Sequence, residues 1–291
     1  MRAPPRPLEE PYRGRAVPPG SARYLSWLFA ARECRDPLLG IYALLAEWRA
    51  LMDPATESTV AQAKLAWWHE ELHRLRQGTP VHPISRHLAA LPRAAAVDFG
   101  PLIRAVEAAV LQIAGAPLER GAQLEAHGDA LRGGPLIVAA RLAREPAPES
   151  LAGLESCATA LAAGEYLESA IADYRREARA GRVAFPVDEL LAARIEDADL
   201  NAANAPPHVQ SYLAGARRRA ADSFARAAAL LPRSERAAQR HLLVLAALGA
   251  KRLSGSQFHG STADFRLGDL YVAWSTARRA TARAQVLRSV M

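Results

Sequence analysis

The composition of the chain from Ser21 onward restricts it to helices. Alanine, leucine, arginine and glutamate dominate this part of the sequence, and the alternation of β-branched and polar residues that is typical of strands is rare. We therefore predict no strand. About ten helices joined by short loops, in a chain that is 50% apolar, indicate an all-α fold built as a single helical bundle. The sequence contains no linker long or polar enough to divide that bundle.

Capping residues, glycines and prolines predict where the helices begin and end. Ser21 is placed to cap a first helix that ends near Arg35, and Asp36 with Pro37 would start a second helix that reaches Met52. The helix that follows Pro117 is expected to break at Gly133, Gly134 and Pro135. The other predicted helices cover about 58–77, 84 onward, 98–114, 150–180, 186 onward, 207–231, 234–253 and 264 to the end.

The first 20 residues are rich in proline and predict an extended lead-in, so the helical domain is expected to span residues 21–288. They contain no apolar segment of the kind found in signal peptides. Cys34 and Cys157, the only cysteines, have no C-x-x-C or Cys/His spacing, which argues against a zinc site or a disulfide framework. The longest apolar run, Leu242 to Ala250, is about half of a bilayer span. These features favour a cytoplasmic protein, with membrane association left open.

The formal net charge is +7, and Lys64 and Lys251 are the only lysines, so almost every cation is arginine. Such basicity suits anionic partners such as phosphates, anionic lipid headgroups or nucleic acid, and an arginine-rich genome explains it equally well. The basic run at residues 217–219 falls in a predicted helix, where a solvated face is the simpler interpretation. We predict no nucleic-acid partner, whereas peripheral membrane contact stays open.

Two acids, Asp173 and Glu177, stand four residues apart in the predicted helix 150–180, so their carboxylates share one face. A carboxylate pair inside a bundle can hold Mg²⁺ that bridges to a diphosphate, because Mg²⁺ prefers oxygen ligands. Acids at this spacing are also common on solvated faces, where Arg176 and Arg179 would neutralise them. The spacing alone favours the solvated face, and only a facing acidic cluster would change that.

Two histidines, His69 and His73, give the run His-Glu-Glu-Leu-His, which satisfies the H-E-x-x-H spacing of zinc hydrolases. No third ligand is evident downstream, and the preceding tryptophans, Trp67 and Trp68, are better explained by packing. Because they point about 100° apart on a helix, only one of them can face the core squarely. Surface histidines are therefore the favoured interpretation, and a zinc hydrolase is the minor alternative.

Three segments occur together in a fixed order. They are Ser21-x-x-Tyr24 before Ile41-Tyr42-Ala43, then Lys64-Leu-Ala-Trp-Trp-His-Glu-Glu-Leu72 with Gly78-Thr-Pro-Val-His-Pro83, and then Asp173-x-x-x-Glu177-x-x-x-Gly181-Arg182 ending in Phe185-Pro186. This order resembles the squalene/phytoene synthase family of head-to-head prenyl transferases. The resemblance covers nearly the whole chain, from about Ser21 to Ala280.

The resemblance implies an isoprenoid-synthase-type bundle around a central cavity, in which two D-x-x-x-D motifs on facing helices hold Mg²⁺ and thereby two prenyl diphosphates. Carried over by position, the first motif falls on Arg49 and Asp53 and the second on Asp173 and Glu177. Asp53, Asp173 and Glu177 are accordingly the implied catalytic and magnesium-binding residues, and His127 falls where the family has a tyrosine. The implied substrate-binding residues are Ser21, Tyr24, Tyr42, Arg49, Tyr166, Ser169 and Arg182.

Arg49, a cation where the resemblance calls for an acid, separates two hypotheses. In the first, the chain resembles a divergent branch that includes the mitochondrial complex I assembly factor with a squalene/phytoene synthase domain. Such a protein would bind an isoprenoid diphosphate, another lipid-like ligand or a protein partner, with weak or no prenyl transfer and without a cofactor. In the second, the chain is an active magnesium-dependent prenyl transferase that condenses farnesyl or geranylgeranyl diphosphate, and Arg49 binds phosphate.

Overall fold

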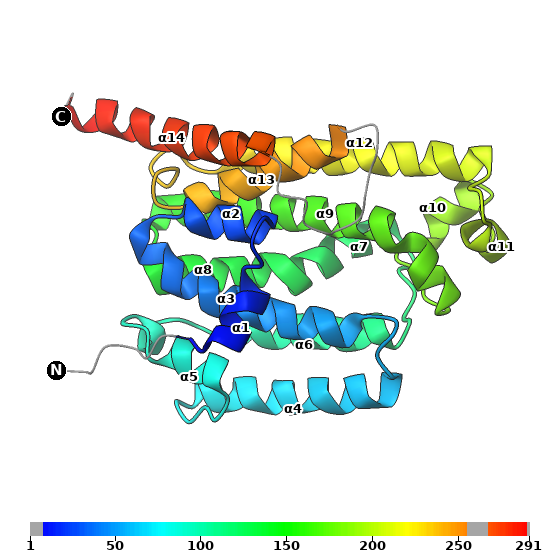
Figure 1. Cartoon of the computed structure of the whole chain (residues 1–291), viewed down its shortest axis with the longest axis horizontal. Coiled ribbons are helices and arrows are strands. Elements are labelled where there is room, and N and C mark those ends of the chain that lie inside the picture. Colours follow the sequence, from blue (N-terminus) through cyan, green and yellow to red (C-terminus); the bar gives the residue numbers. More distant parts are fainter. Residues whose placement is uncertain (1–7, 255–266, 290–291) are drawn as a thin grey trace.

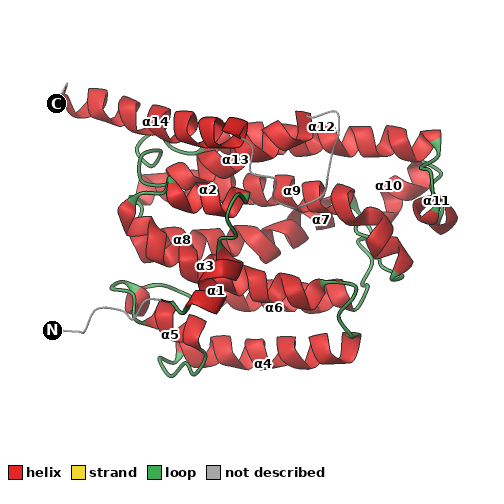
Figure 2. Ribbon diagram, in the orientation of Figure 1, coloured by secondary structure: helices red, strands yellow, loops and turns green. Residues whose placement is uncertain are grey.

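The computed structural model describes residues 8–254 and 267–289, with side chains up to residue 282. Over these residues the regular structure is helical and contains no strand, which confirms the predicted all-α class (Figure 2). The α-helices are α1 Glu10–Ala16, α2 Ala22–Leu28, α3 Arg32–Met52, α4 Ser58–Arg76, α5 Pro83–Ala89, α6 Gly100–Ile113, α7 Gly121–Gly128, α8 Gly134–Ala143, α9 Pro148–Arg179, α10 Val187–Ala192, α11 Asp197–Asn201, α12 Pro207–Leu230, α13 Arg240–Ser254 and α14 Leu267–Ser289. A 3₁₀ turn, η1 Ala94–Ala96, and a π-helix, η2 Asp129–Gly133, complete the set.

The helices are stacked in layers around α9, which has 32 residues and is the longest of those described. In Figure 1, α4 and α5 lie at one edge of the molecule and α12 and α14 at the opposite edge. Between them, α4 packs on α6 and α3 packs on α8, while α12 packs along α9 and against α13. Helices α3 and α9, which carry the expected site residues, therefore lie between these two edges.

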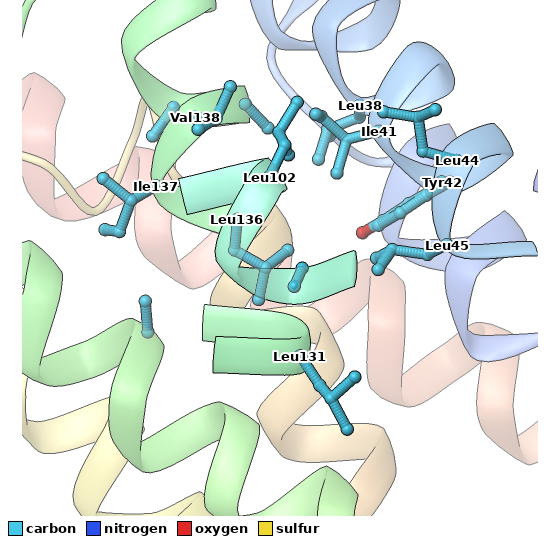
Figure 3. Close-up of a cluster of buried hydrophobic side chains, with 14 of the residues drawn as sticks. Leu38, Ile41, Tyr42, Leu44, Leu45, Leu102, Leu131, Leu136, Ile137 and Val138 are labelled. Carbon is cyan, nitrogen blue, oxygen red and sulfur yellow. The ribbon is translucent and has the colours of Figure 1, made fainter. Parts of the chain in front are cut away.

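The main core lies between α3, α6 and α8 (Figure 3). Leu38, Ile41 and Leu44 of α3 are fully buried, and they meet Leu102 of α6 and Leu136 of α8. Burying side chains of this size stabilises the fold by about 1.5–3 kcal/mol each. The apolar stripe of α3 thus fixes the direction of its far end, where Asp53 follows Met52.

Helix α4 matches its predicted range, and its tandem tryptophans divide as expected. Trp68 is buried, with its ring edge-on to Trp48 at a centroid distance of 6.2 Å. Trp67 remains 43% exposed. Only one of two neighbouring side chains on a helix can face the core, and Trp68 is that one.

The predicted boundary between the first two helices is wrong. The first helix ends at Leu28 instead of near Arg35, and α3 begins at Arg32 and continues through Pro37. The guanidinium of Arg240, far along the sequence, donates to the carbonyls of Phe29 and Ala30 at 2.7 and 3.1 Å. This tertiary contact satisfies carbonyl groups that the end of α2 leaves free, and no local sequence signal announces it.

The predicted break at Gly133 and Gly134 is also wrong, because η2 leads directly into α8. A Cβ on Gly133 would collide with the carboxylate of Asp129 and lie 3.4 Å from the carbonyl oxygen of Ala158 on α9. Gly133 therefore leaves room for the Asp129 side chain within a continuous helix. Pro135 stands in the first turn of α8, a position that suits proline.

The N-terminal segment differs from the predicted extended lead-in, since residues 10–16 form α1. Leu8, Ala16 and Val17 are buried in the main core, and α1 packs against α3. The apolar residues of this segment gain their stability from that burial, which composition cannot reveal. Pro4, Pro5 and Pro7 lie outside the described residues.

Cys34 and Cys157 are free thiols, both buried, which agrees with the predicted lack of a disulfide between them. Among the helices that the structure describes, none combines the length and apolar character needed to cross a bilayer.

Phe224 of α12 is enclosed by glycines on two other helices, and this contact can be tested. A Cβ on Gly249 of α13 would lie 2.5 Å from Cε2 of Phe224, so we expect Gly249→Ala to lower the free energy of unfolding by about 2 kcal/mol. At Gly215 of α12 an added Cβ would have no neighbour within 4 Å, so Gly215→Ala should be neutral or raise stability by up to ~1 kcal/mol. Urea denaturation measures both, and equal effects of the two substitutions would contradict this packing.

Candidate functional site

Asp53 and Asp173 are brought to the same arginine. Nη1 of Arg176 donates to Oδ2 of Asp53 at 3.0 Å, and Nη2 of Arg176 lies 3.5 Å from Oδ1 of Asp173. The other oxygen of Asp53 accepts a hydrogen bond from the backbone N–H of Ala55, which is the main reason that the pKa of Asp53 is lowered. The end of α3 and the last turns of α9 therefore meet through one guanidinium.

Glu177, one turn after Asp173, points to a different partner. Its carboxylate is buried and accepts from Nε of Arg182 at 2.7 Å, while Nη2 of Arg182 donates to the carbonyl of Met52 at 3.0 Å. Burial raises the pKa of Glu177, and Arg182 opposes that rise. The predicted pair thus consists of one half-exposed acid and one buried acid, each paired with arginine.

The oxygen atoms that could bind Mg²⁺ show whether these residues form a magnesium site. Mg²⁺ is bound through carboxylate oxygens, and here oxygens of Asp53, Asp173 and Glu177 already meet guanidinium groups. An ion between the two aspartates would have to displace Arg176. Arg49, the residue four before Asp53, brings a further positive charge and no ligand atom. This arrangement does not fit two facing acidic motifs.

Further arginines lie deeper between α2, η2 and α9. Nη2 of Arg132 donates to Oγ of Ser169 at 2.9 Å, and the Arg132 guanidinium lies 5.9 Å from the centre of the Tyr166 ring. Arg23 of α2 similarly lies 5.7 Å from the ring centre of Tyr42. These contacts place three residues that the sequence singled out, Tyr42, Tyr166 and Ser169, beside Arg23 and Arg132.

The charges in this region interact. Burial lowers the pKa of Arg23 and the pKa of Arg132. The negative charge of Glu165 raises both pKa values, and the positive charge of Arg49 lowers both further. We call Arg23, Arg49 and Arg132 the arginine cluster. It is cationic, and Glu165 is the acid that offsets it most strongly at both Arg23 and Arg132.

The remaining sequence-predicted substrate residues have structural contacts. Oγ of Ser21 accepts from the backbone N–H of Tyr24 at 3.0 Å, so Ser21 caps α2 as expected. Tyr24 is half-buried beside Trp27. The hydroxyls of Tyr42 and Ser26 are 2.9 Å apart and buried. Ser21 and Tyr24 therefore position α2, the helix that carries Arg23.

A cavity of about 430 Å³ opens between α6, α7 and α9 and is lined in part by Tyr166, Glu177 and Arg182. His127 also lines it, with its ring edge-on to Tyr166 at 5.4 Å and Nε2 lying 3.3 Å from Oε1 of Gln112. Burial and the charge of Arg132 lower the pKa of His127 to about 4, so this imidazole is neutral at pH 7. Tyr166 contacts both the arginine cluster and the cavity.

Residues 18–261 match the squalene/phytoene synthase family. The chain belongs to this family. A dehydrosqualene synthase, solved in complex with a ligand, matches with a TM-score of 0.70 at 13% identity, over 91% of this chain and 92% of that chain. The squalene synthase HpnC from Alicyclobacillus acidocaldarius matches with a TM-score of 0.60 at 18% identity, over 92% of both chains. The helical bundle is therefore the isoprenoid synthase fold. No curated protein matches the sequence.

Sequence reasoning about this family member missed Arg23, Arg132 and Glu165. Arg132 lies in η2, a π-helix, and such turns are often found at functional sites. Because a break was expected at Gly133, the sequence predicted neither this π-helix nor the contact of Arg132 with Ser169. Arg176 was expected to neutralise Asp173, but its contact with Asp53 joins residues 123 positions apart.

The two histidines of the minor alternative, a zinc site on α4, lie side by side. The rings of His69 and His73 are 4.8 Å apart, and Nε2 of His69 lies 3.5 Å from Glu107 on α6. Within residues 8–254 and 267–282, no group of three or more histidine, cysteine, aspartate or glutamate side chains is arranged to hold one ion.

The ion pair of Glu177 with Arg182 should be the stronger of the two arginine contacts. Arg182→Gln leaves a buried carboxylate without its partner, so we expect a loss of about 3 kcal/mol at pH 7. Arg176→Gln, which removes the arginine that is 50% exposed, should cost no more than about 1 kcal/mol. Denaturant unfolding of both variants measures the difference.

The loss in Arg182→Gln should depend on pH. Burial already raises the pKa of Glu177 and removal of Arg182 raises it further, so the folded variant binds the proton more tightly than the unfolded chain. Its stability should therefore fall as pH rises from the unfolded pKa, about 4.3, to the folded one. A loss that stays constant across this range would contradict the assignment, and Glu177→Gln in the same variant should remove the pH dependence.

Proposed function

We propose that this member of the squalene/phytoene synthase family binds an isoprenoid diphosphate, or a similar anionic lipid, through arginine side chains and has weak or no prenyl transferase activity. The observation that carries the proposal is the position of Arg176, whose guanidinium contacts both Asp53 and Asp173. In this interpretation the first acidic motif is eroded at Arg49, and guanidinium groups take the place of the metal ions.

The charge balance around Glu165 supports an anionic ligand. Arg23 and Arg132 both interact electrostatically with Glu165, and Arg49 is near enough to lower the pKa of both arginines. Arg252 of α13 makes a two-pronged ion pair with Glu168 of α9. Two guanidiniums, those of Arg23 and Arg132, therefore share one carboxylate, which leaves positive charge in excess around Glu165. A diphosphate head matches this excess, and guanidinium groups suit phosphate oxygens because their N–H donors form a planar fork.

The same arrangement explains why prenyl transfer would be weak. Ionisation of an allylic diphosphate requires that the charge developing on the leaving group be neutralised, which metal ions do by several kcal/mol. A fixed arginine stabilises such charge where it already points. Arg176 and Arg182, however, are paired with carboxylates. The positive charge of each is therefore already offset and stabilises a leaving diphosphate less.

The alternative is an active magnesium-dependent synthase that condenses farnesyl or geranylgeranyl diphosphate. Its support is that Asp53 and Asp173 do meet at one point, and that Arg176 is half-exposed and holds them weakly. Magnesium with its diphosphate could then displace Arg176, with Arg49 binding phosphate. Asp53, Asp173 and Glu177 would be the metal-binding residues, and Ser169, Tyr166 and Arg182 would line the substrate site.

A protein-assembly role, as in the branch that includes the complex I assembly factor, is a variant of the first proposal. It would use the same ligand-binding bundle with a protein partner. The eroded motif at Arg49 supports it only through the resemblance.

Titration of farnesyl diphosphate into the protein, with either EDTA or Mg²⁺ present, distinguishes these functions. We expect calorimetric binding that is unchanged by EDTA and is weakened about tenfold in Arg132→Gln, because that variant removes one charged hydrogen-bond donor. Arg226→Gln, at an arginine of α12 that is 54% exposed, is the matched control and should bind as the wild type does.

A dependence of binding and turnover on Mg²⁺ would contradict the proposal. Binding that requires Mg²⁺, together with release of diphosphate that disappears in Asp173→Ala, would establish the active synthase and reject the proposal.

A further inference from the structure

Helix α14 lies at the outer edge of the molecule (Figure 1) and exposes apolar and cationic side chains along one side. Leu267, Tyr271 and Trp274 are 79%, 65% and 43% exposed, and Arg278 is exposed as well. Their spacing of three or four residues puts them on one side of the helix. We call these four residues the α14 stripe.

The opposite side of α14 is what holds the helix to the protein. Ala273 and Ala277 are buried with Val244 and Leu248 of α13 and with Leu25 of α2. The stripe is therefore not a core surface that has been left open, since the helix already has a separate packed face.

The stripe is continuous and carries no negative charge. The rings of Tyr271 and Trp274 have centroids 6.0 Å apart, and the guanidinium of Arg278 lies 5.3 Å from the Trp274 ring centre. Arg279 beside it is also exposed. The acid in the first turn of the helix, Asp269, is half-buried and binds Nζ of Lys251 at 2.6 Å.

We propose that the α14 stripe docks the protein onto the surface of an anionic lipid bilayer. Tryptophan and tyrosine are enriched at the boundary between headgroups and acyl chains, and a helix with aromatic and apolar residues beside arginines lies flat in that boundary. Arginines at the same surface are attracted by anionic headgroups. The net charge of +7 acts in the same direction.

A second copy of the chain fits the stripe less well. In a two-fold contact the same patch would face itself, and it offers no carboxylate to Arg278 or Arg279 over the residues whose side chains are described. A bilayer, in contrast, supplies both an apolar layer and negative charge.

Docking in this way would serve a protein whose ligand is a lipid, although it does not depend on the proposed function. Helix α14 contacts α2, the helix that carries Arg23 of the arginine cluster. A bilayer at α14 would therefore be one helix away from the cluster.

Co-sedimentation with vesicles tests the docking surface. The full chain should sediment with vesicles of phosphatidylglycerol and phosphatidylcholine and remain in solution with phosphatidylcholine alone. The double variant Tyr271→Ser and Trp274→Ser should weaken binding at least about tenfold, because it removes the aromatic anchors. Arg278→Gln should weaken it about fivefold and reduce its sensitivity to salt.

Trp67→Ser is the matched control. Trp67 is also 43% exposed and also has an arginine, Arg74, 5.6 Å from its ring centre, but it lies on α4 at the other edge of the molecule. We expect this variant to bind vesicles as the wild type does. Thermal unfolding of each variant verifies that the fold is kept.

Three results would overturn the proposal. They are no binding of the wild type to anionic vesicles, an equal loss in Trp67→Ser and in the α14 variants, or self-association in sedimentation equilibrium that Trp274→Ser abolishes without any vesicle binding. The last result would assign the stripe to a second copy. None of the three bears on whether the arginine cluster binds diphosphate.

Discussion

The contact of α9 with α12 and α13 decides how the site residues of α9 point. Gly164 of α9 and Gly249 of α13 leave room for the ring of Phe224 of α12, and a Cβ at Gly164 would lie 2.9 Å from that ring. With one side of α9 closed in this way, the positions on its other sides turn toward α3 and η2. Ser169 meets Arg132, and Asp173 shares Arg176 with Asp53. The glycine and phenylalanine contacts thus determine the site although none of these residues belongs to it.

The ion pairs at the end of α9 differ in how easily they can be exchanged. Arg176 is half-exposed, so its pairs with Asp53 and Asp173 contribute at most about 1 kcal/mol and can give way to a competing ion. Glu177 and Arg182 are almost fully enclosed, and breaking that pair would leave a buried charge at a cost of about 3 kcal/mol or more. A ligand can therefore compete for the outer pair, whereas the inner pair ties α9 to the end of α3 through Met52.

Local sequence signals succeeded for several helices that depend on their own residues. Helix α4 follows its apolar stripe, Ser21 caps α2, and Trp67 and Trp68 divide between solvent and core as helix geometry requires. They failed where a distant residue supplies the missing interaction. Arg240, more than 200 positions away, satisfies the carbonyls at the end of α2.

The sequence by itself determined the helical class and the spacing of Asp173 and Glu177, because both follow from short-range periodicity along one chain. The order of its segments also pointed to the squalene/phytoene synthase family, to which the chain belongs. Only the tertiary structure decided that Asp173 and Glu177 have different partners, that Arg176 joins Asp53, and that Arg23 and Arg132 gather around Glu165. The contact of Arg176 with Asp53 and the grouping of Arg23 and Arg132 around Glu165 join residues on different elements, and their distances depend on how those elements pack. No pattern within a single helix encodes that packing.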